Sequence, residues 1–187
     1  MNNNTKFAIS ALLIILAAST RFLPHSIPNV SPIAGMALFG AAYFNRSALG
    51  LIIPLLALFL SDLVLNNTVL REYYPQIGFI WITSIWVMLG FVAVWAVGRF
   101  GLKKVSVPTV LISSITGSLV FFLVSNLSTF LETTLYSKDF SGLMTCYAAG
   151  LPFLKYTFIG DLAFTSVIFG LFAIVTSDNS VVNKIEL

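Results

Sequence analysis

Two carboxylates lie in apolar stretches of the sequence, where an acid is unfavourable unless it has a functional role or a charged or hydrogen-bonding partner. Asp62 lies near the end of one such stretch, and Asp161 lies inside another. An acid at the centre of a membrane helix costs about 2.5–3.5 kcal/mol on insertion scales, so such acids are usually functional or paired. Asn66 follows Asp62 by one helical turn, and Thr157 and Thr165 flank Asp161 at the same spacing. The pattern predicts polar helix faces that bind a polar solute, relay protons, or pair with basic residues.

The longest polar stripe runs along one face of residues 109–131. Such a face should look into a helical bundle and not into lipid. Its hydroxyls also suit simple hydrogen bonds between helices, worth about 0.6 kcal/mol per contact, and both interpretations remain open for the serines and threonines. The stripe comprises Ser114, Ser118, Ser125, Thr129 and Glu132, with Asn126 beside it.

The composition places these residues in a membrane. Hydrophobic residues make up 58% of the 187 residues and charged residues only 9%, whereas about 25% charged is usual for a soluble domain. Tyr73 to Gly98 and Val105 to Leu131 contain no charged residue. Each stretch exceeds the roughly 20 apolar residues that a membrane-spanning helix needs.

We predict an all-α fold, a polytopic transmembrane helical bundle of about six spans that forms one domain over residues 1–187. Residues 132–150 are half apolar and predict a connector at the membrane interface. The predicted spans are residues 7–22, 32–44, 47–65, 76–97, 109–131 and 151–176.

The first two predicted spans have alternatives. Lys6 before the first span and the small residues 17–19 after it also fit a signal peptide, whose removal would leave five spans. The second span is short and rich in small residues, so a re-entrant segment is the alternative to a full crossing. Ser31 and Pro32 predict an N-cap and a first-turn proline, and the small pair Ala37 and Ala41 predicts close helix packing.

Basic residues set the expected orientation. Six spans place both termini on one side, together with the basic loop that holds Arg99, Lys103 and Lys104. Lys6, Arg46 and Lys184 fall on that same side. Because cytoplasmic loops carry an excess of Lys and Arg, the N-terminus and the C-terminus are expected in the cytoplasm. The opposite, outer side then holds Arg21, Arg71, Lys138 and Lys155.

In this orientation, polar side chains from several spans converge toward the outer side, as a pocket for a small polar solute requires. Arg21 or Lys155 would suit a solute carboxylate, and tyrosines would stack on a ring; alternatively, the two bases only neutralise the acids. The predicted substrate-binding residues are Arg21, His25, Asp62, Asn66, Asn126, Tyr147 and Asp161.

Several other chemistries lack their motifs. His25 is the only histidine, and only together with Asp62 or Glu132 would it suit a divalent ion, so the sequence leaves a metal site unknown. The sequence has no phosphate-binding glycine loop, zinc-protease helix or nucleophile elbow, which predicts neither an enzyme nor a cofactor. No basic cluster with interleaved aromatics predicts nucleic-acid binding.

Three groups of motifs together resemble a known bacterial family. The first comprises residues 21–25, 28–32, 37–40 and 43–44, and the second comprises Pro54-Leu55 and Ser61-Asp62. The third runs from Phe121-Phe122 through residues 126, 136, 142–143, 146–147 and 152–153 to Gly160-Asp161 and residues 169–170. The likeness covers about residues 20–172. The family consists of uncharacterised membrane proteins regarded as transport proteins, and it is similar to the substrate-binding S components of energy-coupling factor (ECF) transporters.

The resemblance implies an S-component-like fold in the bacterial cytoplasmic (inner) membrane. It implies capture of a small solute from outside, with energy supplied by partners, namely a transmembrane coupling subunit and ATPases. The sequence departs from the family pattern at Phe130 and Ser137, and the first span has no regular Ala-xxx-Ala face for a coupling subunit. We therefore expect the substrate-binding membrane subunit of an importer. The alternatives are a stand-alone proton-coupled carrier and a non-transporting membrane scaffold.

Overall fold

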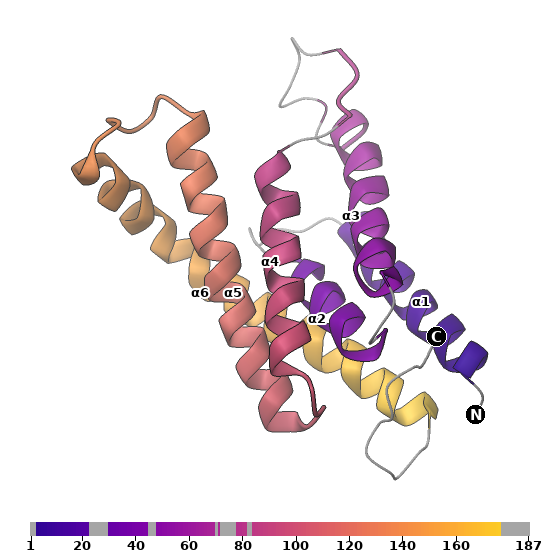
Figure 1. Ribbon diagram of the computed structural model, residues 1–187. Helices are drawn as coiled ribbons and strands as arrows, with labels where there is room; N and C mark the ends of the chain where they lie inside the picture. Colours follow the sequence, from indigo (N-terminus) through magenta and orange to yellow (C-terminus); the bar gives the residue numbers. More distant parts are fainter. Residues whose placement is uncertain are drawn as a thin grey trace.

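The computed structural model describes residues 3–22, 30–44, 48–69, 71, 78–81 and 84–176. Every regular element in these residues is a helix, which confirms the all-α prediction (Figure 1). The elements are α1 (Asn3–Ser19), the short 3-10 helix η1 (Thr20–Phe22), α2 (Ile33–Tyr43), α3 (Leu49–Asn67), α4 (Ile85–Gly101), α5 (Val107–Glu132) and α6 (Phe140–Thr176).

The outer faces of the helices are apolar. Along α3, four exposed residues recur at intervals of four, Ile52, Leu56, Leu60 and Val64, so that they form one stripe along the helix. By length and composition, α3, α5 and α6 can each cross a membrane, and the shorter apolar helices are Phe7–Phe22, Ile33–Tyr43 and Ile85–Gly101. A large exposed apolar surface of this kind suits contact with lipid.

Helix α2 forms the centre of the structure and contacts each of the other five α-helices. All its residues from Ala34 to Tyr43 are buried. Phe39 and Tyr43 pack against Phe169 and Phe172 of α6, with ring centroids 4.2–5.5 Å apart. With 11 residues, α2 is about 16 Å long, roughly half of a hydrocarbon core. Its predicted shortness is therefore confirmed, and its neighbours surround it.

Small residues let α2 approach its neighbours closely. A Cβ atom at Gly98 of α4 would lie 2.8 Å from the Ala41 Cβ, so the predicted close packing of Ala41 is present. On the α3 side, Gly40 faces the backbone of Gly50 and the ring of Pro54. These contacts leave no room for larger residues at the crossings.

A pair of glycine substitutions tests this packing. We expect Gly40→Ala to destabilise the protein by about 1–3 kcal/mol, as overpacked cores do, because its Cβ would lie 2.6 Å from the Pro54 Cγ. Gly170→Ala is the matched control, because a Cβ there meets no atom within 4 Å. Thermal unfolding of the two variants in detergent measures the difference; equal melting temperatures would contradict the packing described.

The fourth predicted span, 76–97, is wrong at both ends, because the helix covers Ile85–Gly101. Ser84 caps its N-terminus by accepting a hydrogen bond from the Trp86 backbone N–H (3.2 Å). Before it, the side chain of Asn67 holds the Ile80 backbone: its Nδ2 donates to the Ile80 carbonyl (2.8 Å) and its Oδ1 accepts from the Ile80 N–H (2.9 Å). Residue 80 is thereby tied to the end of α3 and does not join a helix.

The sixth predicted span also began too late, since α6 starts at Phe140 and not at residue 151. The Asp139 carboxylate accepts a hydrogen bond from the Gly142 backbone N–H (2.7 Å), as an N-cap residue does. This bond, followed by one from the Ser137 hydroxyl, lowers the pKa of Asp139. The connector is therefore only residues 133–139, and most of the segment 132–150 is helix.

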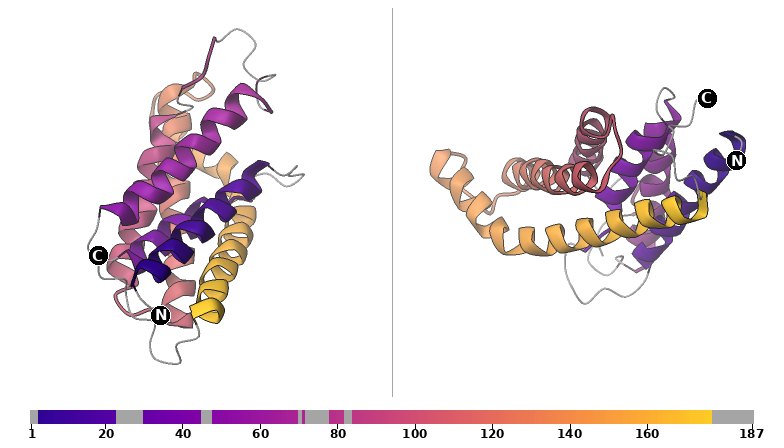
Figure 2. Two further views of the ribbon diagram at one scale, coloured as in Figure 1. Left: turned by 90° about the vertical axis from the view of Figure 1, so that its right-hand side faces the viewer. Right: turned by 90° about the horizontal axis from the view of Figure 1, so that it is seen from below.

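Helix α6 is long and bends along its course, as the view from below shows (Figure 2). Pro152 lies within it. Because proline lacks an N–H and its ring clashes with the preceding turn, a helix bends at this position. The part of α6 before Pro152 packs beside the end of α5. The part after Pro152 also contacts α5, and it runs along α2 and α1.

Candidate functional site

The structure holds a cavity at the end of the bundle where α1, α3 and α5 finish and α2, α4 and α6 begin. In the described part of the chain, α3 makes no close backbone contact with α5 or α6. The separation leaves a cavity of about 610 Å³ between η1 and α3 on one side and α5 and α6 on the other. This volume lies within the range of about 300–1,000 Å³ that is usual for small-molecule sites.

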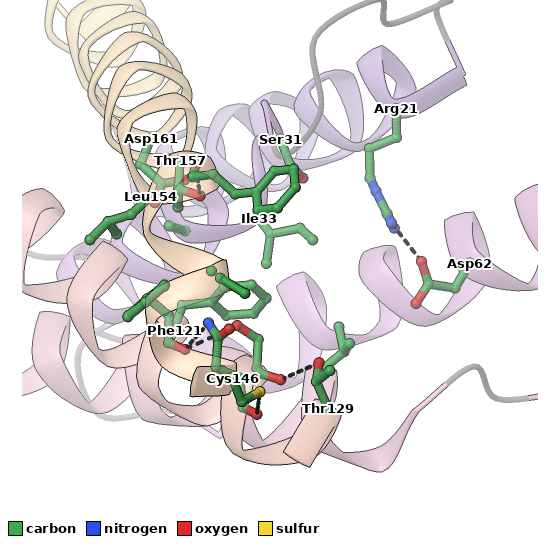
Figure 3. A pocket seen from close by; sticks show the side chains of 18 of the residues that line it. Arg21, Ser31, Ile33, Asp62, Phe121, Thr129, Cys146, Leu154, Thr157 and Asp161 are labelled. Carbon is green, nitrogen blue, oxygen red and sulfur yellow. Dashed lines mark hydrogen bonds and ion pairs between the residues drawn. The ribbon is translucent and has the colours of Figure 1, made fainter. Parts of the chain in front are cut away.

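Arg21 and Asp62 form an ion pair on one wall of this cavity (Figure 3). The Arg21 Nη2 lies 2.6 Å from the Asp62 Oδ1. The Nη1 of the same guanidinium donates to the Ser61 Oγ (2.5 Å) and to the Leu58 carbonyl (3.5 Å). Arg21 therefore neutralises an acid, as one of the two sequence interpretations expected, and both of its terminal nitrogens already have partners.

Asp161 lies on the opposite wall and is almost fully buried, with 4% of its surface exposed. Its Oδ2 accepts a hydrogen bond from the Ser118 Oγ of α5 (2.6 Å). One helical turn nearer the start of α5 and the end of α6, the Ser114 Oγ lies 3.5 Å from the Thr165 Oγ1. The predicted inward faces of α5 and α6 are thus confirmed at these residues, and the hydroxyls join the two helices.

Neutral polar groups line the cavity between these two walls. Asn126, Ser125 and Thr129 come from α5, and Asn66 comes from α3. The Asn126 side chain donates to the Phe122 carbonyl (2.8 Å) and packs directly on Gly150 of α6. A side chain at position 150 would displace Asn126, so the glycine keeps this amide at the cavity wall.

Aromatic rings complete the cavity. Phe121, Phe122 and Phe153 belong to its lining, and so does Tyr136 from the loop between α5 and α6. The aromatic wall therefore consists mainly of phenylalanines, with Tyr136 as its tyrosine among the described residues. Phenylalanine faces offer apolar contact to a solute, and also a favourable surface for a cation.

Ser31 differs from its predicted role. The residue before α2 is Pro32, and α2 has no side-chain cap. The Ser31 Oγ is buried and has no hydrogen-bond partner among the described residues, and Ser31 belongs to the cavity lining. Within the described part of the chain, its hydroxyl can therefore form a hydrogen bond with a solute.

Five of the seven predicted substrate-binding residues share this cavity: Arg21, Asp62, Asn66, Asn126 and Asp161. Tyr147 is not part of the lining, because its hydroxyl donates to the Leu123 carbonyl (2.8 Å) and its ring packs edge-on to Phe122. Lys155 also lies outside it, with its Nζ 4.7 Å from the centre of the Tyr156 ring. His25 lies outside the described residues.

Residues that sequence reasoning missed share one helical stripe. Cys146, Gly150 and Phe153 lead, at steps of three or four, to Thr157 and Asp161. Such spacing puts all five on one face of α6. Continuing this stripe backwards from Asp161 would have reached all of them. The predicted helix boundary at residue 151 excluded Cys146 and Gly150.

Within the described ranges, no three His, Cys, Asp or Glu residues come close enough to hold a metal ion. The metal hypothesis involved His25, which these ranges do not include. The described cavity instead offers an ion pair, one further carboxylate, amides, hydroxyls and aromatic rings. This set suits recognition of an organic molecule by hydrogen bonds, charge and stacking.

No curated protein and no solved structure shows significant similarity to the chain. A family match covers nearly all of it, residues 1–183. The chain therefore belongs to a family of unknown function, DUF6580.

Proposed function

We propose that the protein is a membrane transport protein that binds a small solute in this cavity, as the substrate-binding subunit of an importer. The observation that carries the proposal is the 610 Å³ cavity, whose lining joins five predicted polar residues from η1, α3, α5 and α6. A purely structural bundle would gain stability by filling such a volume, because interiors pack at high density. An open, polar and aromatic cavity is what a binding site needs.

The proposed orientation places the cavity at the outer side of a bacterial cytoplasmic membrane, with six membrane-associated helices and both termini inside. Two exposed lysines, Lys103 and Lys104, lie in the loop between α4 and α5, at the opposite end of the bundle from the cavity. Basic loops are retained in the cytoplasm. A solute would then reach the cavity from outside the cell.

Cysteine labelling tests this orientation in intact cells. The experiment uses a Cys146→Ala background, so that only the introduced cysteine can be labelled. The native Cys146 is buried, and its reactivity is expected to be low. We expect Ser137→Cys, in the loop between α5 and α6, to react with a membrane-impermeant maleimide, and Lys104→Cys to react only after the membrane is opened. The reverse pattern would contradict the orientation and place the cavity at the cytoplasmic face.

Affinity purification in mild detergent tests the function itself. Mass spectrometry then identifies both the proteins and the small molecules that accompany the tagged chain. Retention of one solute, together with a transmembrane coupling subunit and ATPases, is the expected result. Because partner subunits would supply the energy, no nucleotide-binding motif is needed in this chain. A protein that emerges alone and empty would contradict the proposal and favour a non-transporting role.

A stand-alone proton-coupled carrier is the second candidate, and one observation favours it. Asp161 is a buried acid whose hydrogen-bond partner in the described chain is a neutral hydroxyl. Buried acids of this kind serve as proton sites in carriers. Solute uptake by vesicles that contain only this protein, abolished by an uncoupler, would support the carrier; uptake that requires ATP and other subunits would exclude it.

A further inference from the structure

We infer that the solute is a small organic cation with an aromatic or apolar body, and that Asp161 supplies the charge that holds it. The inference rests on the proposed function, since it names the class of solute for the same cavity. It follows from the charges in the cavity wall and from the partners that each charge already has.

The described lining contains one basic and two acidic residues, Arg21, Asp62 and Asp161. With all three ionised, the formal charge of the wall is −1. Arg21 and Asp62 neutralise one another at 2.6 Å. The charge of Asp161 then has no opposite charge in the described lining. The remaining lining is mostly uncharged and does not compensate this charge. A cationic ligand would compensate it.

Asp161 has no basic partner among the residues of the described ranges. Asp161 is buried, and its hydrogen bond comes from the neutral Ser118 hydroxyl. Arg21 is not free to turn toward it, because the guanidinium is also bound to Ser61 and to the Leu58 carbonyl. Lys155, close in sequence, rests on the Tyr156 ring outside the lining.

The rest of the wall fits the body of such a cation. Phe121, Phe122 and Phe153 line the same cavity as Asp161 and Asn126. Aromatic faces attract cations that are removed from water, and they also stack on flat rings. The Ser31 hydroxyl and the Asn126 amide remain as neutral groups for hydrogen bonds to the solute.

Three indole probes that differ in the charge of one group test the inference. Tryptamine is a cation, tryptophol is neutral and indole-3-propionate is an anion at neutral pH. Binding to the purified full-length protein in detergent is measured by calorimetry. We expect tryptamine to bind about tenfold or more tightly than tryptophol, the equivalent of one charge-assisted hydrogen bond, and indole-3-propionate to bind most weakly.

Three variants assign this preference to Asp161. Asp161→Asn keeps the shape and should remove the difference between tryptamine and tryptophol. Ser118→Ala removes the hydrogen bond but not the charge and should keep the difference. Asp139→Asn makes the same acid-to-amide change outside the cavity, where asparagine also serves as a cap, and should also keep it. If Asp161→Asn fails to fold, the ranking of the three probes on the wild-type protein decides alone.

Equal or tighter binding of tryptophol or indole-3-propionate would overturn the inference but support a solute-binding cavity. The absence of binding by all three probes would also overturn it. The proposed function would then be decided separately by the co-purification experiment, whose result does not depend on the charge of the solute.

Discussion

Replacement of Arg21 by methionine is expected to lower the free energy of unfolding by about 3 kcal/mol or to prevent accumulation of the folded protein, because breaking a buried ion pair strands a charge. Only 15% of the Arg21 side chain and 13% of the Asp62 side chain are exposed. Methionine is unbranched like arginine, but it is shorter and uncharged, so it leaves the Asp62 carboxylate unpaired. The guanidinium also ties η1 to α3 through Ser61 and Leu58, and these bonds would be lost as well.

The double variant Arg21→Met with Asp62→Leu separates charge from packing. Replacing both members of a buried pair by apolar residues is often neutral, so the double variant should recover most of the stability that the single variant loses. Lys103→Met is the control, because that lysine is exposed in the loop between α4 and α5. The measurement is thermal unfolding in detergent. A double variant as unstable as the single one would contradict a role for the ion pair.

Filling the cavity should have the second large effect. Thr157 belongs to the lining and lies one helical turn from Asp161. We expect Thr157→Trp to reduce the amount of co-purifying solute by at least about tenfold, because the indole takes the space of the solute and an affinity loss of about 1.4 kcal/mol already gives this factor. The solute is quantified by mass spectrometry per mole of folded protein.

Ile159→Trp is the matched control for this change. Ile159 lies on the same helix, but it is 61% exposed on the outer face of the bundle. A tryptophan there meets lipid or detergent and should leave the solute content unchanged. Equal losses in both variants would indicate a general disturbance of α6, and equal retention would place the solute somewhere other than this cavity.

Local sequence patterns predicted the polar core of the site. Asp62 and Asp161 stood out because acids are unfavourable in apolar helices, and their helical companions marked which faces look inward. The small residues of α2 likewise indicated close packing, which Ala41 and Gly98 show. Each of these predictions depended on spacing within one helix, which a single sequence displays directly.

Features that depend on contacts between distant segments were not predictable in this way. The start of α4 is set by the Ser84 cap and by the hydrogen bonds of the Asn67 side chain to the Ile80 backbone. These bonds join residues that are 13 positions apart in the sequence. The predicted sixth span began at residue 151, but the bent α6 starts at Phe140 and continues through Pro152. The choice between Arg21 as a ligand-binding group and as a partner for Asp62 needed the three-dimensional arrangement.

The central claim is that a solute binds in the cavity between α3, α5 and α6, and a cryo-electron microscopy structure of the protein purified with its retained solute tests it most directly. We predict density for one small molecule between the Arg21–Asp62 pair and Asp161, in contact with Asn126 and Phe121. A cavity filled by a lipid acyl chain, or a solute bound at another surface while this cavity holds only water, would contradict the account.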